Sequence, residues 1–363
     1  MLKKIVKFPL LVLGIISLFA GLWAALGKLE WVQADSFTDF PSHHGALMVA
    51  GFLGTVIALE RAVVLHAWWG YLAPLLSGAG TMAILAGAPA HVSVRLYTLG
   101  SLAYLAVSAS FLRRVVNLSV GLLIFAGAFL VAGNVTWLMH GWDFRVILWW
   151  IGFLLITIAG ERFELTHNFM GSNAKSAQSA FLFCVAVISA GTLAFQFHIE
   201  HGYRMCGAGM MLMSIWLLRF DIAKLNLRKT GLQRFMAICL MTGYVWLMLS
   251  GGIALWSAPS ESGFLYDAAL HAFFLGFVIS MIFAHAPVIF PGITGFMIPF
   301  RGIFYAHFAR LQASLLLRIW SDFAGRETGR MHGGLLNVAA ILLFLASTIY
   351  SAVKSRLDGP SAS

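Results

Sequence analysis

The sequence predicts an all-α integral membrane protein with about twelve transmembrane helices. Of its 363 residues, 60% are hydrophobic and only 10% are charged, whereas an ordinary soluble domain carries roughly 25% charged residues. The apolar runs are continuous and about 20 residues long, which is the length of helix that crosses a ~30 Å hydrocarbon core. Strands of a membrane barrel would alternate in polarity, so these runs favour helices. The lipid bilayer is therefore the first expected partner.

Twelve apolar segments are predicted to span the bilayer within one polytopic domain, residues 1–363. In chain order they are 8–27, 45–67, 70–89, 96–113, 116–139, 145–166, 178–198, 204–220, 234–256, 266–286, 302–319 and 333–353. The first segment follows Lys3, Lys4 and Lys7, as the apolar core of a signal peptide would. We favour a retained helix, because the run is long for a signal peptide and no small-residue cleavage pattern follows it.

Charges between the segments predict the orientation, because short cytoplasmic loops are enriched in Lys and Arg. With the N-terminus inside, the predicted inner charges are Arg113, Arg114, Lys224, Arg228, Lys229, Arg234, Lys354 and Arg356, and the outer ones are Glu30, Asp35, Asp39, Glu200 and Glu261. Arg318, Arg326 and Arg330 fall outside and oppose the rule, which weakens the eleventh span. We expect a bacterial inner-membrane protein with both termini in the cytoplasm. Its net charge of +10 then reflects orientation rather than nucleic-acid binding.

An internal repeat links the second and sixth segments. Residues 51–66 and 152–167 share eight identities over sixteen positions, among them a Gly-Phe-Leu start and a Glu-Arg pair. A fainter third copy begins at Gly276-Phe277 in the tenth segment. Because the copies lie four segments apart, we expect three four-helix units around a pseudo-threefold axis. Their approximate bounds would be 1–113, 114–220 and 221–353.

Histidines are the first candidates for chemistry, because ionisable groups inside a membrane are costly and usually functional. His44 and His271 lie near the outer ends of the second and tenth segments, which the repeat makes equivalent. Two neutral imidazoles facing each other there are what a six-coordinate haem iron needs. His43 and His332 lie in the same outer layer and are further candidates for cofactor binding. The alternative is that all four are interfacial histidines bonded to loop backbone.

Two further sets of residues point to a second metal. His198, Glu200 and His201 are spaced so that both imidazoles and the carboxylate could hold copper or zinc. The same residues are also typical of an ordinary polar loop after a span. His285 and His307 belong to the inner layer and would form a second site if they converge.

Two Glu-Arg pairs inside predicted spans complete the set. Glu60-Arg61 and Glu161-Arg162 are the repeated pairs, and each lies toward the inner side. A buried ion pair with a partner on another span would make them helix clasps. The functional alternative is a proton relay through the inner third of the membrane.

The segments that begin with histidine resemble a known family. The run His43-His44-Gly45-Ala46-Leu47-Met48-Val49-Ala50-Gly51-Phe52 is similar to the His-rich opening of NnrS-type membrane proteins, and His271-Ala272-Phe273-Phe274-Leu275-Gly276 to a second hallmark of that family. The family's His-x-His-Glu-Met run is replaced here by His43-His44. The resemblance implies haem, copper and a role in the response to nitric oxide.

The helix plan also resembles the catalytic subunit of haem-copper oxidases, which implies low-spin haem ligation by His44 and His271. The oxidase histidine patterns after the fifth span are not met, so a full oxygen-reducing centre is not expected. We therefore predict a membrane haem protein, with haem b and copper as cofactors, in electron transfer or nitric-oxide and respiratory redox chemistry. An oxidoreductase of this kind would take electrons from a redox partner protein or a quinone. The alternatives are an ion- or proton-coupled transporter that uses intramembrane Glu and His residues, and a structural or assembly subunit.

Overall fold

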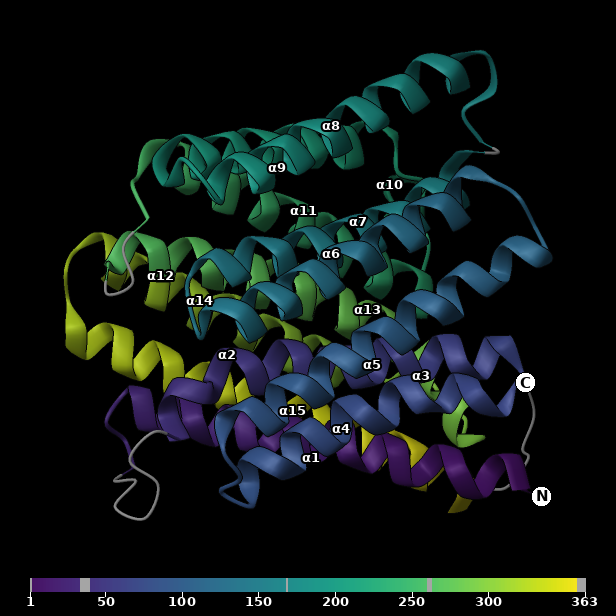
Figure 1. Cartoon of the computed structure of the whole chain (residues 1–363). Helices are drawn as coiled ribbons and strands as arrows, with labels where there is room; N and C mark the ends of the chain where they lie inside the picture. Colours follow the sequence, from purple (N-terminus) through teal and green to yellow (C-terminus); the bar gives the residue numbers. More distant parts are fainter. Residues whose placement is uncertain (1, 33–39, 168, 260–262, 358–363) are drawn as a thin grey trace. The chain divides into compact units, whose positions relative to one another are not determined.

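A computed structural model describes residues 2–32, 40–167, 169–259 and 263–357, and within these ranges the chain is helical without a strand (Figure 1). The all-α prediction is therefore confirmed for the described residues. The acidic residues Asp35, Asp39 and Glu261, on which the orientation partly depended, lie outside the described residues.

Each of the twelve predicted segments coincides with a helix or with a run of joined helices. Nine helical stretches among the described residues are long and apolar enough to cross a membrane: Val6–Lys28, Phe40–Leu65, Ala90–Arg113, Leu118–His140, Arg145–His167, Gly171–Phe195, Gly231–Trp256, Phe264–Thr294 and Glu327–Leu357. The other three are α4 (Leu72–Leu85), which is short, and α9 (Ile199–Phe220) and α14 (Phe304–Phe323), which carry more polar side chains. The count of twelve spans stays a prediction.

The chain divides into two compact units, and each is described by itself. Unit 1 comprises residues 1–157 with 292–294, and unit 2 comprises 158–291 with 295–363. The helices of unit 1 are α1 (Leu2–Lys28), η1 (Phe40–His43), α2 (His44–Ala46), η2 (Leu47–Leu53), α3 (Gly54–Leu65), η3 (Trp68–Tyr71), α4, α5 (Ala90–Ser110), η4 (Phe111–Arg113) and α6 (Leu118–His140). The helix α7 (Arg145–His167) contributes to both units. The predicted three-unit repeat stays a prediction.

Unit 2 holds the remaining helices. They are η5 (Gly171–Asn173), α8 (Ala174–Phe195), α9, α10 (Ala223–Asn226), α11 (Gly231–Trp256), α12 (Phe264–His271), η6 (Ala272–Ile279), α13 (Ser280–Thr294), α14 and α15 (Glu327–Leu357). In this unit α9 packs between α8 and α11, and α14 packs along α15. The helix α13 ends at Thr294, and Gly295 caps it with a left-handed φ of 76° that suits a residue without Cβ.

Buried hydroxyl groups join three helices of unit 1. Ser17 Oγ of α1 donates to Thr81 Oγ1 of α4 at 2.8 Å, and Thr81 Oγ1 lies 3.0 Å from Tyr97 Oη of α5. All three side chains are buried. Because a buried hydroxyl without a partner is costly, this chain of hydroxyl groups fixes how α1, α4 and α5 pack together.

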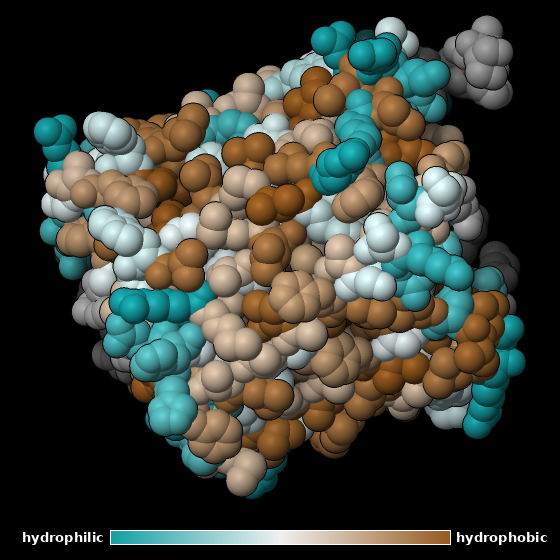
Figure 2. Space-filling view, turned by 90° about the horizontal axis from the view of Figure 1, so that it is seen from above, coloured by the Kyte–Doolittle hydropathy of each residue, from teal (hydrophilic) through white to brown (hydrophobic). Residues whose placement is uncertain are grey.

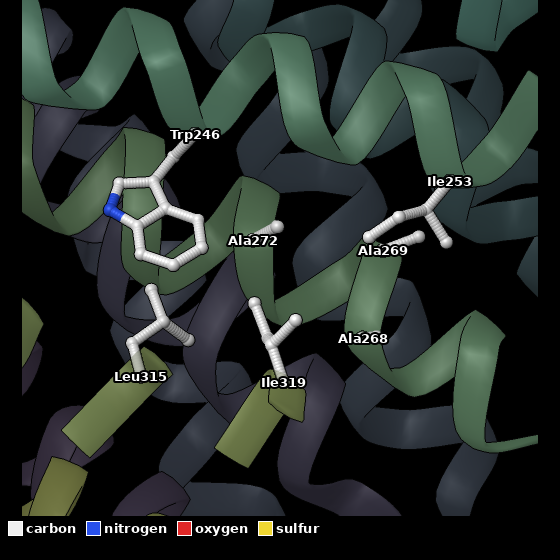
Figure 3. Close-up of a cluster of buried hydrophobic side chains, with 7 residues drawn as sticks. All are labelled: Trp246, Ile253, Ala268, Ala269, Ala272, Leu315 and Ile319. Carbon is white, nitrogen blue, oxygen red and sulfur yellow. The ribbon is translucent and has the colours of Figure 1, made fainter. Parts of the chain in front are cut away.

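An apolar cluster joins α11, α12 and α14 in unit 2 (Figure 3). Its side chains are Trp246, Ile253, Ala268, Ala269, Ala272, Leu315 and Ile319. Figure 3 shows the Trp246 indole and Leu315 turned toward each other across the space between α11 and α14. The indole also satisfies its polar atom, because Trp246 Nε1 donates to Gln312 Oε1 at 2.6 Å. The cluster therefore holds the polar helix α14 against two apolar ones.

Large apolar side chains also cover much of the outside. On the face in Figure 2, hydrophobic residues lie over wide areas between hydrophilic groups. Over the whole of the described chain, exposed large apolar side chains include Phe19, Phe183, Leu249, Trp320 and Ile349. Soluble monomers rarely expose large contiguous apolar patches, so these outer faces suit contact with lipid.

The glycine of each Gly-Phe repeat copy meets a neighbouring helix at close range. A Cβ added to Gly51, Gly152 or Gly276 would lie 2.6 Å from Thr81 Oγ1, Phe129 Cε1 or Trp246 Cβ, respectively. The phenylalanine that follows is buried in each copy: Phe52, Phe153 and Phe277. Close helix packing is thus a physical reason for the repeated dipeptide, since small residues let membrane helices approach.

We expect Gly276→Ala to destabilise the protein by about 1–3 kcal/mol, the usual cost of overpacking a filled interior. The added methyl group would press on the backbone end of the Trp246 side chain, which cannot move away easily. Gly252→Ala is the matched control, because Gly252 also lies within a helix and nothing is found within 4 Å of its added Cβ. Thermal unfolding in detergent should show a lower midpoint for Gly276→Ala only. Equal midpoints would contradict the packing argument.

Candidate functional site

The two candidate haem ligands stand at the same kind of structural junction. His44 begins the short helix α2 and is followed by the π-helical stretch η2, Leu47–Leu53. His271 ends α12 and is followed directly by the π-helical stretch η6, Ala272–Ile279. The remaining repeat copy, residues 152–167 of α7, is α-helical throughout. Because π-helical turns are rare and frequent at functional sites, the distortion marks the two copies that carry an outer histidine.

Both imidazoles are fixed through the same ring atom. His44 Nδ1 lies 2.8 Å from the carbonyl oxygen of Gly21 in α1, and His271 Nδ1 lies 2.8 Å from that of Asp267. A carbonyl oxygen only accepts, so Nδ1 carries the proton and Nε2 carries the lone pair. This tautomer is the one that a histidine uses when Nε2 binds a metal and a backbone group orients the ring. Both side chains are half-buried.

The same hydrogen bond occurs at other histidines, so the tautomer alone does not select a ligand. His285 Nδ1 lies 2.7 Å from Met281 O, and His332 Nδ1 lies 2.7 Å from Thr328 O. His332 is exposed near the start of α15, whereas His43 is half-buried at the end of η1. His44 belongs to unit 1 and His271 to unit 2, so their pairing across a haem stays a prediction.

Asp267 is the centre of an ion cluster in unit 2. Its Oδ2 atom lies 3.3 Å from His271 Nδ1 and accepts from Arg318 Nη2 at 2.9 Å and from Arg318 Nε at 3.2 Å. Its Oδ1 atom lies 3.3 Å from Arg330 Nη2. One carboxylate of α12 thus binds a guanidinium of α14 and another of α15. Because buried ions need such partners, the cluster joins the three helices.

A second carboxyl group, Asp322, belongs to the same cluster. Its Oδ1 atom lies 3.5 Å from Arg330 Nε, and its side chain is buried at the end of α14. Burial raises the pKa of Asp322 to about 7, and the nearby Asp267 carboxylate adds to the rise. Arg318 and Arg330 are therefore structural ion-pair partners rather than free loop charges. This pairing explains why two of the three arginines that opposed the orientation rule occur where they do.

Arg162 is the centre of a second buried group in unit 2. Its Nε and Nη2 atoms donate to Asp221 Oδ2 at 2.7 Å and Oδ1 at 2.6 Å, a bidentate pair. Tyr244 Oη donates to Asp221 Oδ2 at 2.5 Å, and the backbone N–H of Ala223 donates to Oδ1 at 2.7 Å. His285 interacts electrostatically with Arg162 and Asp221. Arg162 thus joins α7 to the end of α9 and, through Asp221, to Tyr244 of α11, as a helix clasp would.

The other members of the Glu-Arg pairs have different surroundings. Arg61 Nη2 lies 4.0 Å from Glu60 Oε1, and both side chains are partly exposed. Glu161 is half-buried on α7, beside the buried Arg162. The acceptor in the Arg162 clasp is therefore an aspartate 59 residues away rather than a repeated glutamate. The relay interpretation of these pairs stays a prediction.

The predicted second-metal residues do not form a compact ligand group among the described residues, where no set of three or more His, Cys, Asp or Glu side chains has such an arrangement. His198 and His201 are exposed, with ring centroids 6.5 Å apart, and Glu200 pairs with Arg204 at 2.7 Å. His307 is buried, with Nδ1 2.9 Å from Ser347 Oγ and its ring 4.7 Å from that of Phe283. His285 and His307 thus have different hydrogen-bond partners, Met281 and Ser347.

The sequence matches the family described as "Domain of unknown function (DUF8744)" over residues 7–353. The chain belongs to this family. No curated protein matches the chain. The DUF8744 match extends from α1 into α15, so both histidine junctions and both ion clusters lie within the family's domain.

Sequence reasoning missed the acidic partners of the DUF8744 chain, Asp221, Asp267 and Asp322. One signal was present, because Asp267 lies four residues before His271 and residues at that spacing share a helical face. Asp221 lies next to the end of α9, 59 residues along the chain from Arg162 of α7. Asp322 lies near the end of α14, only eight residues before Arg330 of α15, but a turn between two helices separates them, so no helical periodicity connects either pair.

We expect Arg162→Gln to destabilise the protein by about 3–5 kcal/mol, because it leaves the Asp221 carboxylate buried without its bidentate partner. The matched control is Arg204→Gln, which breaks an exposed pair with Glu200 and should cost at most about 1 kcal/mol. Thermal unfolding in detergent measures both. A loss for Arg162→Gln no larger than that of the control would show that the pair does not hold these helices.

Asp322 predicts a pH dependence of stability. Because its pKa is about 7 in the folded protein and ordinary in the unfolded chain, folding favours the protonated form. This stabilisation is complete below about pH 4 and is lost as the pH rises through about 7. We expect the unfolding midpoint to fall over that range, and Asp322→Asn to flatten the fall. An unchanged profile in the variant would assign the pH dependence to another group.

Proposed function

We propose that this chain is a membrane haem protein in which His44 and His271 ligate a haem b near the outer face. The observation that carries the proposal is the shared junction. His44 lies three residues before the π-helical stretch η2 and His271 directly before η6, and each holds its Nδ1 proton on a backbone carbonyl. The donor set fits the group, since two neutral imidazoles presenting Nε2 are the ligands of a six-coordinate haem iron. The resemblance to NnrS-type proteins supports the same assignment.

The haem would supply one-electron chemistry, and the protein would supply ligation, burial and control of the reduction potential. With both His44 and His271 as its ligands, the haem would be suited to electron transfer rather than to binding of a gas. The function would lie in nitric-oxide or respiratory redox chemistry, with a quinone or a redox protein as the electron partner. Copper remains the proposed second metal on the strength of the resemblance.

The proposed setting is the bacterial inner membrane, with twelve spans in three four-helix units and both termini in the cytoplasm. The pairing of Arg318 and Arg330 with Asp267 and Asp322 supports the eleventh span, because it removes two opposing charges from the orientation rule. The recurrence of a close-packed glycine in α7, η2 and η6 supports the repeat.

A proton-coupled transporter is the second candidate function. The observation that favours it is the buried Asp322 carboxyl group, whose pKa of about 7 allows it to gain and lose a proton near neutral pH. If the chain is such a transporter, Asp322→Asn should abolish proton-driven uptake, and the purified wild-type protein should contain no haem.

The test of the haem proposal is a reduced-minus-oxidised visible spectrum of the purified full chain, together with metal analysis. We expect a Soret and an α band of low-spin haem b, because two imidazoles give a strong axial field. Absence of both bands after expression with sufficient haem would refute the proposal.

Ligand variants then test the residues. His44→Ala and His271→Ala should each abolish the low-spin spectrum, while His91→Ala, which removes an exposed histidine of α5, should leave it unchanged. His43→Ala and His332→Ala examine the other predicted cofactor histidines. Retention of the spectrum in both primary variants would show that the ligands are other residues, and His332 would be examined next.

A further inference from the structure

The side chain of Asp267 contacts the candidate ligand His271 from one helical turn away. Its Oδ2 atom lies 3.3 Å from His271 Nδ1, the ring atom that also bonds to the Asp267 carbonyl oxygen at 2.8 Å. Both acceptors of the one Nδ1 proton therefore come from a single residue. Two oxygen atoms of Asp267, the backbone carbonyl and Oδ2, thus fix the tautomer of the His271 ring.

We propose that Asp267 is a positioning residue for His271 and sets the electron-donating strength of this ligand, and thereby the reduction potential of the haem. The proposal rests on the proposed function, because it needs His271 as an axial ligand. A carboxylate that accepts from a ligating histidine raises the basicity of the ring. A more basic ligand favours the ferric over the ferrous iron, so the carboxylate lowers the potential.

Two arginines fix the position of the Asp267 carboxylate and limit how strongly it binds the His271 proton. Arg318 donates twice to Oδ2, the same oxygen that faces His271, and Arg330 binds Oδ1. Arg318 therefore competes with the imidazole for the electron density of one oxygen. The side chain of Arg318 is 7% exposed, so water does not screen this competition. Removal of Arg318 should strengthen the bond to His271, and removal of the Asp267 carboxylate should abolish it.

Asp322 provides a matched control for charge alone. Its carboxyl group pairs with Arg330 in the same cluster, whereas the carboxylate that contacts His271 is that of Asp267. At pH 8.5 Asp322 is ionised, because its pKa is about 7. Asp322→Asn and Asp267→Asn then remove equal charge from the cluster, and only the second replaces the anionic acceptor beside the His271 proton with a neutral amide.

The experiment is a redox titration of the haem in the purified full chain at pH 8.5, followed in the α band. For Asp267→Asn we expect the ratio of reduced to oxidised haem at a fixed ambient potential to rise about tenfold, because the ligand ring loses the carboxylate that raises its basicity. For a one-electron couple this corresponds to about 59 mV. Asp322→Asn should change the ratio much less, and Asp267→Glu, which keeps a carboxylate, should restore most of the wild-type value.

Arg318→Gln tests the opposite sign and serves if Asp267→Asn does not accumulate. It frees Oδ2 for His271 and removes a positive charge, so the reduced fraction should fall. Equal shifts in Asp267→Asn and Asp322→Asn, or an unchanged or raised reduced fraction in Arg318→Gln, would overturn the role of Asp267 while leaving the haem in place. Absence of haem from the wild-type protein, or low-spin haem that survives His271→Ala, would instead overturn the proposed function and this inference with it.

Discussion

Buried charge in an apolar chain is the constraint on which the arrangement of unit 2 depends. An ion without a partner in such surroundings costs several kcal/mol. The buried Asp221 and the partly buried Asp267 accordingly lie beside guanidinium groups. Those groups come from distant helices: Arg162 from α7, and Arg318 and Arg330 from α14 and α15. Each aspartate therefore determines which helices must be neighbours. Hydrophobic burial, which has no direction, does not make that selection.

The close approach of a helix backbone to a neighbouring side chain is the second determinant of the packing. It explains the repeated Gly-Phe dipeptide better than a catalytic or binding role does. Gly152 and Gly276 each lie against an aromatic side chain, Phe129 and Trp246, where a Cβ would not fit. The repeated Gly-Phe dipeptide is thus a packing element common to α-helical and π-helical stretches. What differs between the copies is the histidine that leads into η2 and η6. The proposed function therefore rests on the histidines and the π-helical turns rather than on the repeat itself.

The helices could be predicted from the sequence because hydropathy over about 20 residues is a local property. The helix α14 met that test less well because it carries more polar side chains. Contacts rather than hydropathy hold it in place: Leu315 and Ile319 belong to the α11–α12 cluster, and Arg318 pairs with Asp267. The partners of Arg162 and Arg318 are 59 and 51 residues away, and no periodicity connects them. The π-helical stretches could not be predicted from the sequence either, because hydropathy does not distinguish π-helical from α-helical turns.

The arginines at and after the end of the eleventh predicted span oppose the orientation rule for a related reason. The rule counts Lys and Arg in loops as free charges exposed to the membrane surface, yet Arg318 and Arg330 are ion-paired with Asp267 and Asp322. A paired arginine carries little orientation information, so the rule and the structure are compatible. The same ion cluster places His271 of α12, the proposed haem ligand, beside the carboxylate that binds Arg318 of α14 and Arg330 of α15. One residue, Asp267, thus connects helix packing with the electronic properties of the proposed haem ligand.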